Sequence, residues 1–149
     1  QGIYCYKVDR ATTDDALIDC LQNVPGTLIQ VQECIQYQKL IRVIVINYKV
    51  LSDAVTYDVP SKGWKCSVCL NPAIKKYVVT DPTLIRLAED TARAFGARIN
   101  YIDFFEDAHG HFILNEINTA CSLFFHEKVT GVAINEAIAR FLVDTASAQ

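Results

Sequence analysis

The sequence predicts an α+β fold in which a central antiparallel sheet is flanked by helices. Runs rich in β-branched and aromatic residues recur along the chain, and the helical segments between them lack the regular alternation of a doubly wound sheet. One segment, 81–96, carries signals for both ends of a helix. Two late apolar runs, at 97–107 and 111–118, are separated only by a short polar turn, which is typical of a β-hairpin.

The first half of the chain is expected to hold one helix among β-rich segments. Thr12 or Thr13 is suited to cap that helix, and two aspartates in its first turn complement the helix dipole. The last three β-rich segments are close together, so an antiparallel meander is their simplest arrangement. The predicted elements are, in order, a strand at 2–8, a helix at 12–23 and strands at 27–35, 40–47 and 49–59.

The helix at 81–96 is the clearest element, with a second helix expected at 131–146. Asp81 is a good N-cap, Pro82 suits the first helical position, and Gly96 follows as the terminator. Apolar residues recur at helical spacing in both segments. The predicted buried faces are Leu84, Ala88, Ala92 and Phe95 in the first helix, and Ile134, Ile138, Phe141 and Leu142 in the second.

The composition indicates one folded domain. Of the 149 residues, 51% are hydrophobic and 21% are charged, and this balance excludes a disordered chain. The 14 basic and 17 acidic residues leave no electrostatic footprint for nucleic acid. No apolar run approaches the roughly 20 residues that a membrane helix needs, and no signal peptide is visible. A cytoplasmic protein with neither nucleic acid nor membrane as a partner is therefore expected.

The six cysteines are expected to be mostly reduced, because several lie in apolar segments where a thiol behaves as a small hydrophobe. Cys66 and Cys69 form a C-x-x-C pair, but a zinc site needs four ligands and the histidines lack a supporting spacing. Pro72 argues against the helix that a redox pair requires. Packed or loop thiols are therefore favoured, and His126, in the segment FHEK, is expected on a surface turn.

Glu116 and Asn118 interrupt an otherwise apolar strand. Residues two apart on a strand point to the same face, so these two side chains lie side by side. An acid on a strand is often simply exposed, and a solvated hairpin face is the alternative to a binding site. The apolar residues around them favour a binding site, because a buried charge needs a partner or a metal.

The other strand of the hairpin brings in a third polar residue. With Glu106 opposite His111 and no bulge, Asp103 faces Leu114 and shares the side of the polar pair. Diagonal neighbours in such a ribbon are roughly 7–8 Å apart, so the side chains can converge. Carboxylate and amide oxygens suit Mg²⁺, which rarely takes a full protein cage and completes its shell with phosphate oxygens. The hairpin therefore predicts a magnesium site for a phosphate-bearing ligand.

The segment INYIDFFEDAHGHFILNEINTACSLFFHEKVTGVAINEAIARFL resembles the carboxyl-terminal part of ATP-grasp enzymes, and in particular the ribosomal-protein glutamate ligase branch (alpha-L-glutamate ligases). In that family an Asp on one strand and a Glu-x-Asn on the next hold the Mg²⁺ ions that bridge the phosphates of ATP. The resemblance implies that Asp103, Glu116 and Asn118 are metal ligands, with Mn²⁺ as an alternative ion. It extends over nearly the whole chain and implies an ATP-grasp carboxyl-terminal subdomain over 1–149.

Two upstream segments carry the resemblance further. LIQVQECIQ is similar to the family's hinge strand, which implies that Glu33, Cys34 and Ile35 contact the adenine end of ATP. LIRVIVINYKVLSDAV is similar to a strand pair whose Arg reaches phosphate or acyl phosphate, which implies that role for Arg42. The apolar surroundings of Arg42 agree with this role, because burying an arginine in an apolar strand costs free energy unless the charge is paired with an anion. A surface arginine on an edge strand is the alternative.

The resemblance implies an ATP-dependent carboxylate-amine ligase. A substrate carboxylate is phosphorylated by ATP, and an amine acceptor, on a peptide or an amino acid, attacks the acyl phosphate to form an amide. The chain departs from the family at Cys121-Ser122, where Pro-Gly is usual. It also begins about where the family's glycine-rich loop ends, so the amino-terminal lobe and two upstream lysines are expected to be missing and the isolated chain to catalyse little. An ATP-grasp kinase of a small hydroxyl substrate and a non-catalytic ATP-grasp-like binding module are the alternatives.

Overall fold

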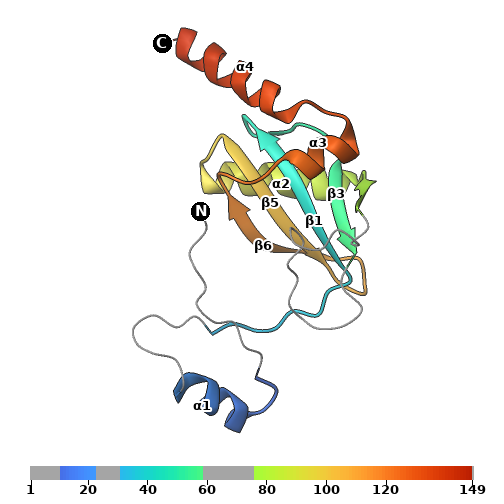
Figure 1. Ribbon diagram of the computed structural model, residues 1–149, viewed down its shortest axis with the longest axis vertical. Coiled ribbons are helices and arrows are strands. Elements are labelled where there is room, and N and C mark those ends of the chain that lie inside the picture. The colour runs from blue at the N-terminus through green and yellow to red at the C-terminus, as the bar shows by residue number, and fades with distance from the viewer. Residues whose placement is uncertain (1–10, 23–30, 59–75, 149) are drawn as a thin grey trace. The chain divides into compact units, whose positions relative to one another are not determined.

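The computed structural model describes residues 11–22, 31–58 and 76–148 (Figure 1). Contacts divide the chain into two units, Gln1–Ile35 and Gln36–Gln149. The strand predicted at 2–8 and the C-x-x-C pair lie outside the described residues, so both stay predictions.

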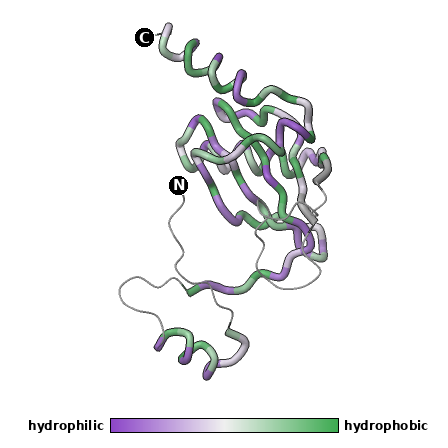
Figure 2. The backbone as a smooth tube through the Cα atoms, viewed as in Figure 1, coloured by the Kyte–Doolittle hydropathy of each residue, from purple (hydrophilic) through white to green (hydrophobic). Residues whose placement is uncertain are grey.

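The first unit contains one short helix, α1 (Asp14–Gln22), among its described residues. The hydroxyl Oγ1 of Thr13 accepts a hydrogen bond from the backbone N–H of Ala16 at 3.2 Å, which confirms the threonine cap. The sequence of this helix, DDALIDCLQ, changes several times between polar and apolar residues, and these appear as bands of the two colours in Figure 2.

The strand predicted at 27–35 is wrong for its described part, because residues 31–35 have no regular secondary structure. Val31 is 61% exposed there. A β-rich sequence becomes a strand only where a neighbouring strand satisfies its backbone hydrogen bonds. No described strand pairs with this segment.

The second unit is built on an antiparallel sheet, as predicted. Its order is β4-β3-β1-β5-β6, and β2 pairs with one end of β1. The strand β1 is therefore central, between β3 and β5. The strands are β1 (Lys39–Ile46), β2 (Lys49–Val50), β3 (Ala54–Asp58), β4 (Lys76–Val79), β5 (Ile99–Glu106) and β6 (Phe112–Asn118).

The helix α2 (Pro82–Phe95) begins and ends where the capping signals predict. The carboxylate Oδ1 of Asp81 accepts hydrogen bonds from the backbone N–H groups of Thr83 and Leu84, at 2.7 and 3.3 Å. Gly96 ends the helix with a φ of 79°, a left-handed conformation that glycine adopts without the steric cost of a side chain.

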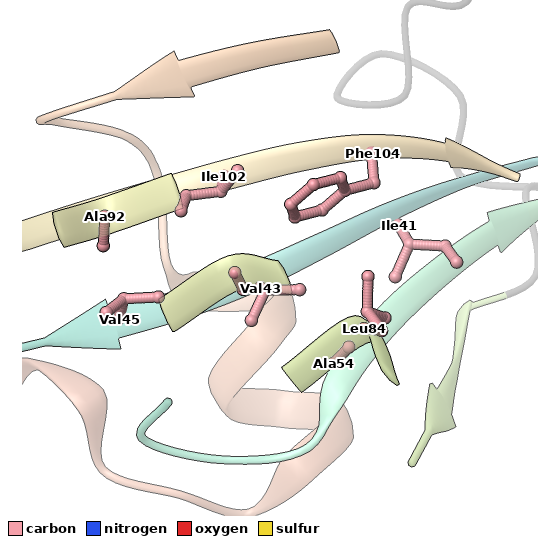
Figure 3. Packing of buried hydrophobic residues seen from close by; sticks show 9 residues of the cluster. Ile41, Val43, Val45, Ala54, Leu84, Ala92, Ile102 and Phe104 are labelled. Carbon is pink, nitrogen blue, oxygen red and sulfur yellow. The ribbon is translucent and has the colours of Figure 1, made fainter. Parts of the chain in front are cut away.

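One face of the sheet packs against α2 and forms the main core (Figure 3). Side chains of Ile41 and Val43 from β1 and of Ile102 and Phe104 from β5 are fully buried beneath the helix. They meet the predicted helix face, whose buried members are Leu84, Ala88 and Ala92. Every second residue of these two strands points to this face, which explains why these four side chains form one layer under the helix.

Two residues of the predicted buried helix faces are exposed instead. Phe95 in the last turn of α2 and Leu142 in α4 (Ile134–Ser147) each keep 53% of their surface exposed. Helical spacing gives the direction of a side chain around the axis, but not how far the packing partner extends along it. Ile134, at the start of α4, is fully buried as predicted.

The opposite face of the sheet is covered in part by α3 (Phe124–Thr130) and by the beginning of α4 (Figure 1). Leu40 and Val55 pack with Val129 of α3, while Ile44 and Tyr101 pack near Ile134. Within residues 11–22, 31–58 and 76–148, no helix is both long and apolar enough to cross a membrane.

Candidate functional site

A row of charged side chains crosses three adjacent strands on the face opposite α2. The strand register places Arg42 of β1 directly opposite Asp103 of β5, and Asp103 directly opposite Glu116 of β6. The next pair along the same face is Tyr101 with Asn118. The three predicted metal ligands therefore share one face, beside the predicted phosphate-binding arginine.

A bulge in the hairpin brings the two carboxylates opposite each other. Glu106 faces Phe112 rather than His111, and Phe104 faces Leu114, so the predicted register is wrong. An irregularity between positions 103 and 104 then inserts one extra residue on β6. A shift of one residue exchanges the two faces of a strand. Before the bulge, Leu114 therefore lies opposite the core residue Phe104, and after the bulge Glu116 lies on the polar face.

Arg42 and Asp103 form a two-point ion pair across β1 and β5. The guanidinium Nε donates to Oδ1 at 2.7 Å, and Nη2 donates to Oδ2 at 2.6 Å. The side chains are 17% and 4% exposed, so the pair is largely withdrawn from water. Arg42 lies on the central strand, which rules out the alternative of an edge-strand surface arginine.

The burial of Asp103 sets the electrostatics of the row. Burial raises the pKa of its carboxyl above the usual range, and the hydrogen bonds and charge of Arg42 pull that pKa back down. The carboxylate of Glu116, opposite on the next strand, raises the pKa of Asp103 further, because a nearby negative charge disfavours ionisation. Two acids held this close favour a cation between them. Glu116 is exposed, so an incoming ion can reach it from solvent.

The donor set fits Mg²⁺ with a phosphate ligand. Asp103 and Glu116 supply carboxylate oxygens and Asn118 an amide oxygen, all hard donors on paired strands. In the described part of the chain, no three His, Cys, Asp or Glu side chains gather as metal ligands. The third member of the predicted set is an amide, so the set contains only two residues of these types. A set of only three donors leaves coordination positions for phosphate oxygens or water.

The predicted adenine-contacting residues lie in the first unit. Glu33, Cys34 and Ile35 have no regular secondary structure, and the first two are exposed. Their contact with ATP stays a prediction. The described cysteines Cys20, Cys34 and Cys121 are thiols.

His126 is buried, so the prediction that it lies on a surface turn is wrong. It lies in α3 rather than on a surface turn and is only 2% exposed. Its Nε2 atom is 3.3 Å from Oγ of Ser52 and 3.2 Å from the backbone oxygen of Asp53, which ties α3 to the start of β3. The spacing of the apolar residues from Phe124 to Thr130 could have indicated this helix, but the segment is too short for a helical periodicity to be clear.

Protonation of His126 is expected to destabilise the fold below neutral pH. Burial, with a smaller contribution from the charge of Arg42, lowers the pKa of His126 from 6.5 to about 4. The unfolded chain binds a proton at this histidine near pH 6.5, whereas the folded chain binds it only near pH 4. The contribution of neutral His126 to the stability of the fold is therefore complete above pH 6.5 and is lost as the pH falls from there through about 4. From this shift of the pKa we expect a loss of about 3 kcal/mol in the free energy of unfolding.

Urea denaturation of the wild type and of His126→Gln between pH 7 and 4 measures this loss. Glutamine keeps an N–H donor but does not titrate, so the free energy of unfolding of the variant should fall less over this range. Parallel curves for the two proteins would show that His126 is not the titrating group.

Comparisons with known proteins identify the fold. No protein-family model matches the sequence, and no curated protein does. The structure is similar to a RiPP-associated ATP-grasp ligase from Chryseobacterium gregarium in complex with ADP and a leader and core peptide, with a TM-score of 0.60, 20% identity, and 76% of this chain and 35% of that chain covered. It is also similar to the macrocyclase MdnC from Microcystis aeruginosa MRC bound with the precursor peptide MdnA, with a TM-score of 0.57, 18% identity, and 74% and 34% of the two chains covered.

A third similar structure is the ATP-grasp ligase PsnB with a phosphomimetic variant of its minimal precursor, Mg and ADP. Its TM-score is 0.59, with 16% identity and with 75% of this chain and 34% of that chain covered. At such identities the likeness shows the fold alone. The chain has the α+β fold of part of these ATP-grasp ligases and spans about a third of their length.

Proposed function

We propose that this chain is the ATP- and Mg²⁺-binding lobe of a carboxylate-amine ligase that forms an amide through an acyl phosphate. Asp103, Glu116 and Asn118 hold the metal, and Arg42 binds phosphate. The observation that carries the proposal is the row of one guanidinium and two carboxylates across β1, β5 and β6. The similar ligases, which were solved with ADP or with Mg and ADP, support it through their shared fold.

The chemical task of the row is to balance charge. Transfer of a phosphoryl group spreads negative charge over its oxygens, and fixed positive groups aimed at those oxygens lower the barrier. Mg²⁺, when bound, supplies such charge directly. Arg42 supplies a planar fork that matches two phosphate oxygens, and its strand backbone holds that fork in place.

The substrates are proposed as a carboxylate and an amine, at least one of them on a peptide. The similar structures contain precursor peptides, which supports a peptide substrate for this chain. The substrate carboxylate takes the γ-phosphoryl group of ATP, and ADP leaves. The amine then attacks the resulting acyl phosphate, displaces phosphate and loses a proton, which gives the amide. Cys121 and Ser122 follow the metal strand closely and are proposed to lie on the acceptor side of the site.

Replacing Glu116 with glutamine is expected to weaken binding of Mg²⁺·ADP by at least about tenfold, because the variant loses a charged metal ligand, and losing one support of a metal site typically costs 10–100-fold. Isothermal titration with Mg²⁺·ADP measures the effect. The matched control is Glu136→Gln, which makes the same chemical change at an acid of α4 that pairs with Arg140 within its own helix.

Two results would count against the proposal. Equal binding by the wild type and Glu116→Gln would remove the metal assignment. Absence of Mg²⁺·ADP binding from both proteins would favour a non-catalytic module that keeps only the fold.

A further inference from the structure

The two carboxylate oxygens of Asp103 have two competing partners, namely Arg42 and the proposed metal ion. Both carboxylate oxygens already accept hydrogen bonds from Arg42, at 2.7 and 2.6 Å. The carboxyl side chain is only 4% exposed, so there is little room for a cation to approach it from solvent while the arginine stays in place. Glu116 on the neighbouring strand is open to solvent.

We infer that Arg42 is a latch on the metal site, which holds Asp103 until an anionic phosphate draws the guanidinium away. This inference rests on the proposed function and concerns the regulation of the same site. A guanidinium fork fits phosphate as well as it fits a carboxylate, so the arginine can exchange one anion for the other when a metal ion takes its place in balancing the charge of Asp103. Metal binding and phosphate binding are thereby coupled.

The latch predicts that divalent metal binds weakly in the absence of phosphate. Glu116 and Asn118 are then the available ligands, and the third ligand is neutralised by its ion pair. Release of Asp103 adds a second carboxylate to the shell. Coupling between two sites typically changes affinity by about 5–150-fold, so removal of the latch should tighten binding of metal alone by a factor in this range.

Binding of Mn²⁺ alone, followed by electron paramagnetic resonance of the free ion, tests the latch on the full chain. Arg42→Gln removes the charged fork, and Arg42→Lys keeps the charge but offers a point contact in place of two parallel hydrogen bonds. The matched control is Lys39→Gln. Lys39 also pairs with both oxygens of an acid across β1 and β5, namely Glu106 at 2.8 and 2.9 Å, but at the end of the strand. Circular dichroism confirms that each variant is folded.

The latch predicts that Arg42→Gln binds Mn²⁺ at least about fivefold more tightly than the wild type. Arg42→Lys should fall between the two, and Lys39→Gln should match the wild type. If Arg42→Gln does not fold, the comparison of Arg42→Lys with the wild type carries the test.

Equal affinity for Mn²⁺ in the wild type and the Arg42 variants would overturn the latch. So would an Arg42→Lys variant equal to the wild type, because removal of charge alone would then explain a tighter Arg42→Gln. A parallel titration with ADP present separates the two proposals. If metal binds in the presence of ADP but with the same affinity in all these variants, only the latch is contradicted. If no metal binds even with ADP, the proposed function is contradicted as well.

Discussion

Replacing Arg42 with alanine is expected to lower the free energy of unfolding by about 3–5 kcal/mol, the usual loss when one partner of a buried ion pair is removed. The substitution leaves the carboxylate of Asp103, which is 4% exposed, without its two-point partner inside the sheet. The expected loss reflects that uncompensated charge more than the strength of the pair itself. Urea denaturation at pH 7, monitored by circular dichroism, measures it.

Two further variants make this expectation specific. Lys39→Ala removes the other two-point ion pair between β1 and β5, but its side chains are 33% and 18% exposed, so a loss of about 0–1 kcal/mol is expected. The double replacement Arg42→Met with Asp103→Leu removes both charges and should recover most of the stability. An Arg42→Ala variant no less stable than Lys39→Ala would show that the pair is not effectively buried.

Replacing Phe104 with alanine is expected to cost about 3–5 kcal/mol as well, but through packing. Phe104 is fully buried in the layer between the sheet and α2, where it neighbours Ile41, Ile102 and Leu84 (Figure 3). Loss of the ring removes its transfer free energy and leaves a cavity that close-packed neighbours fill only in part. Thermal and urea denaturation both report this loss.

Phe95→Ala is the control for this packing argument. It makes the same chemical change in the last turn of α2, where the ring is 53% exposed, so the free energy of unfolding should change by no more than about 0.5 kcal/mol. Similar losses in the two variants would mean that the layer between α2 and the sheet is not the core of this unit.

The elements that could be predicted best from the sequence are those whose ends are set by residues at the ends themselves. The helix α2 is fixed by Asp81, Pro82 and Gly96, and its bounds match the prediction. The strand predicted over 27–35 was wrong for its described part, because β-rich composition specifies a strand only where another strand is there to pair with it. Exposure of Leu142 on α4 was missed for a similar reason, since periodicity does not reveal the extent of the packing partner.

The candidate site shows the same division between local and tertiary information. The predicted grouping of Asp103, Glu116 and Asn118 on one face is confirmed, but the register from which it was predicted is wrong, and Leu114 lies on the other face. The grouping depends on a bulge, which is set by how the two strands settle on the core rather than by the turn between them. The need of Arg42 for an anion was evident from its apolar strand, but its choice of Asp103 depends on the pairing of β1 with β5, strands more than fifty residues apart.

The location of the metal is the central claim, and a paramagnetic ion tests it most directly. Mn²⁺ added with ADP to the isotope-labelled chain should broaden the backbone amide resonances of Asp103, Glu116 and Asn118, which share one face of β5 and β6. The amide of Ser147, at the end of α4, should stay sharp. Broadening centred on another group, such as His109 and His111 in the hairpin turn, with sharp signals at the three predicted ligands, would contradict the account.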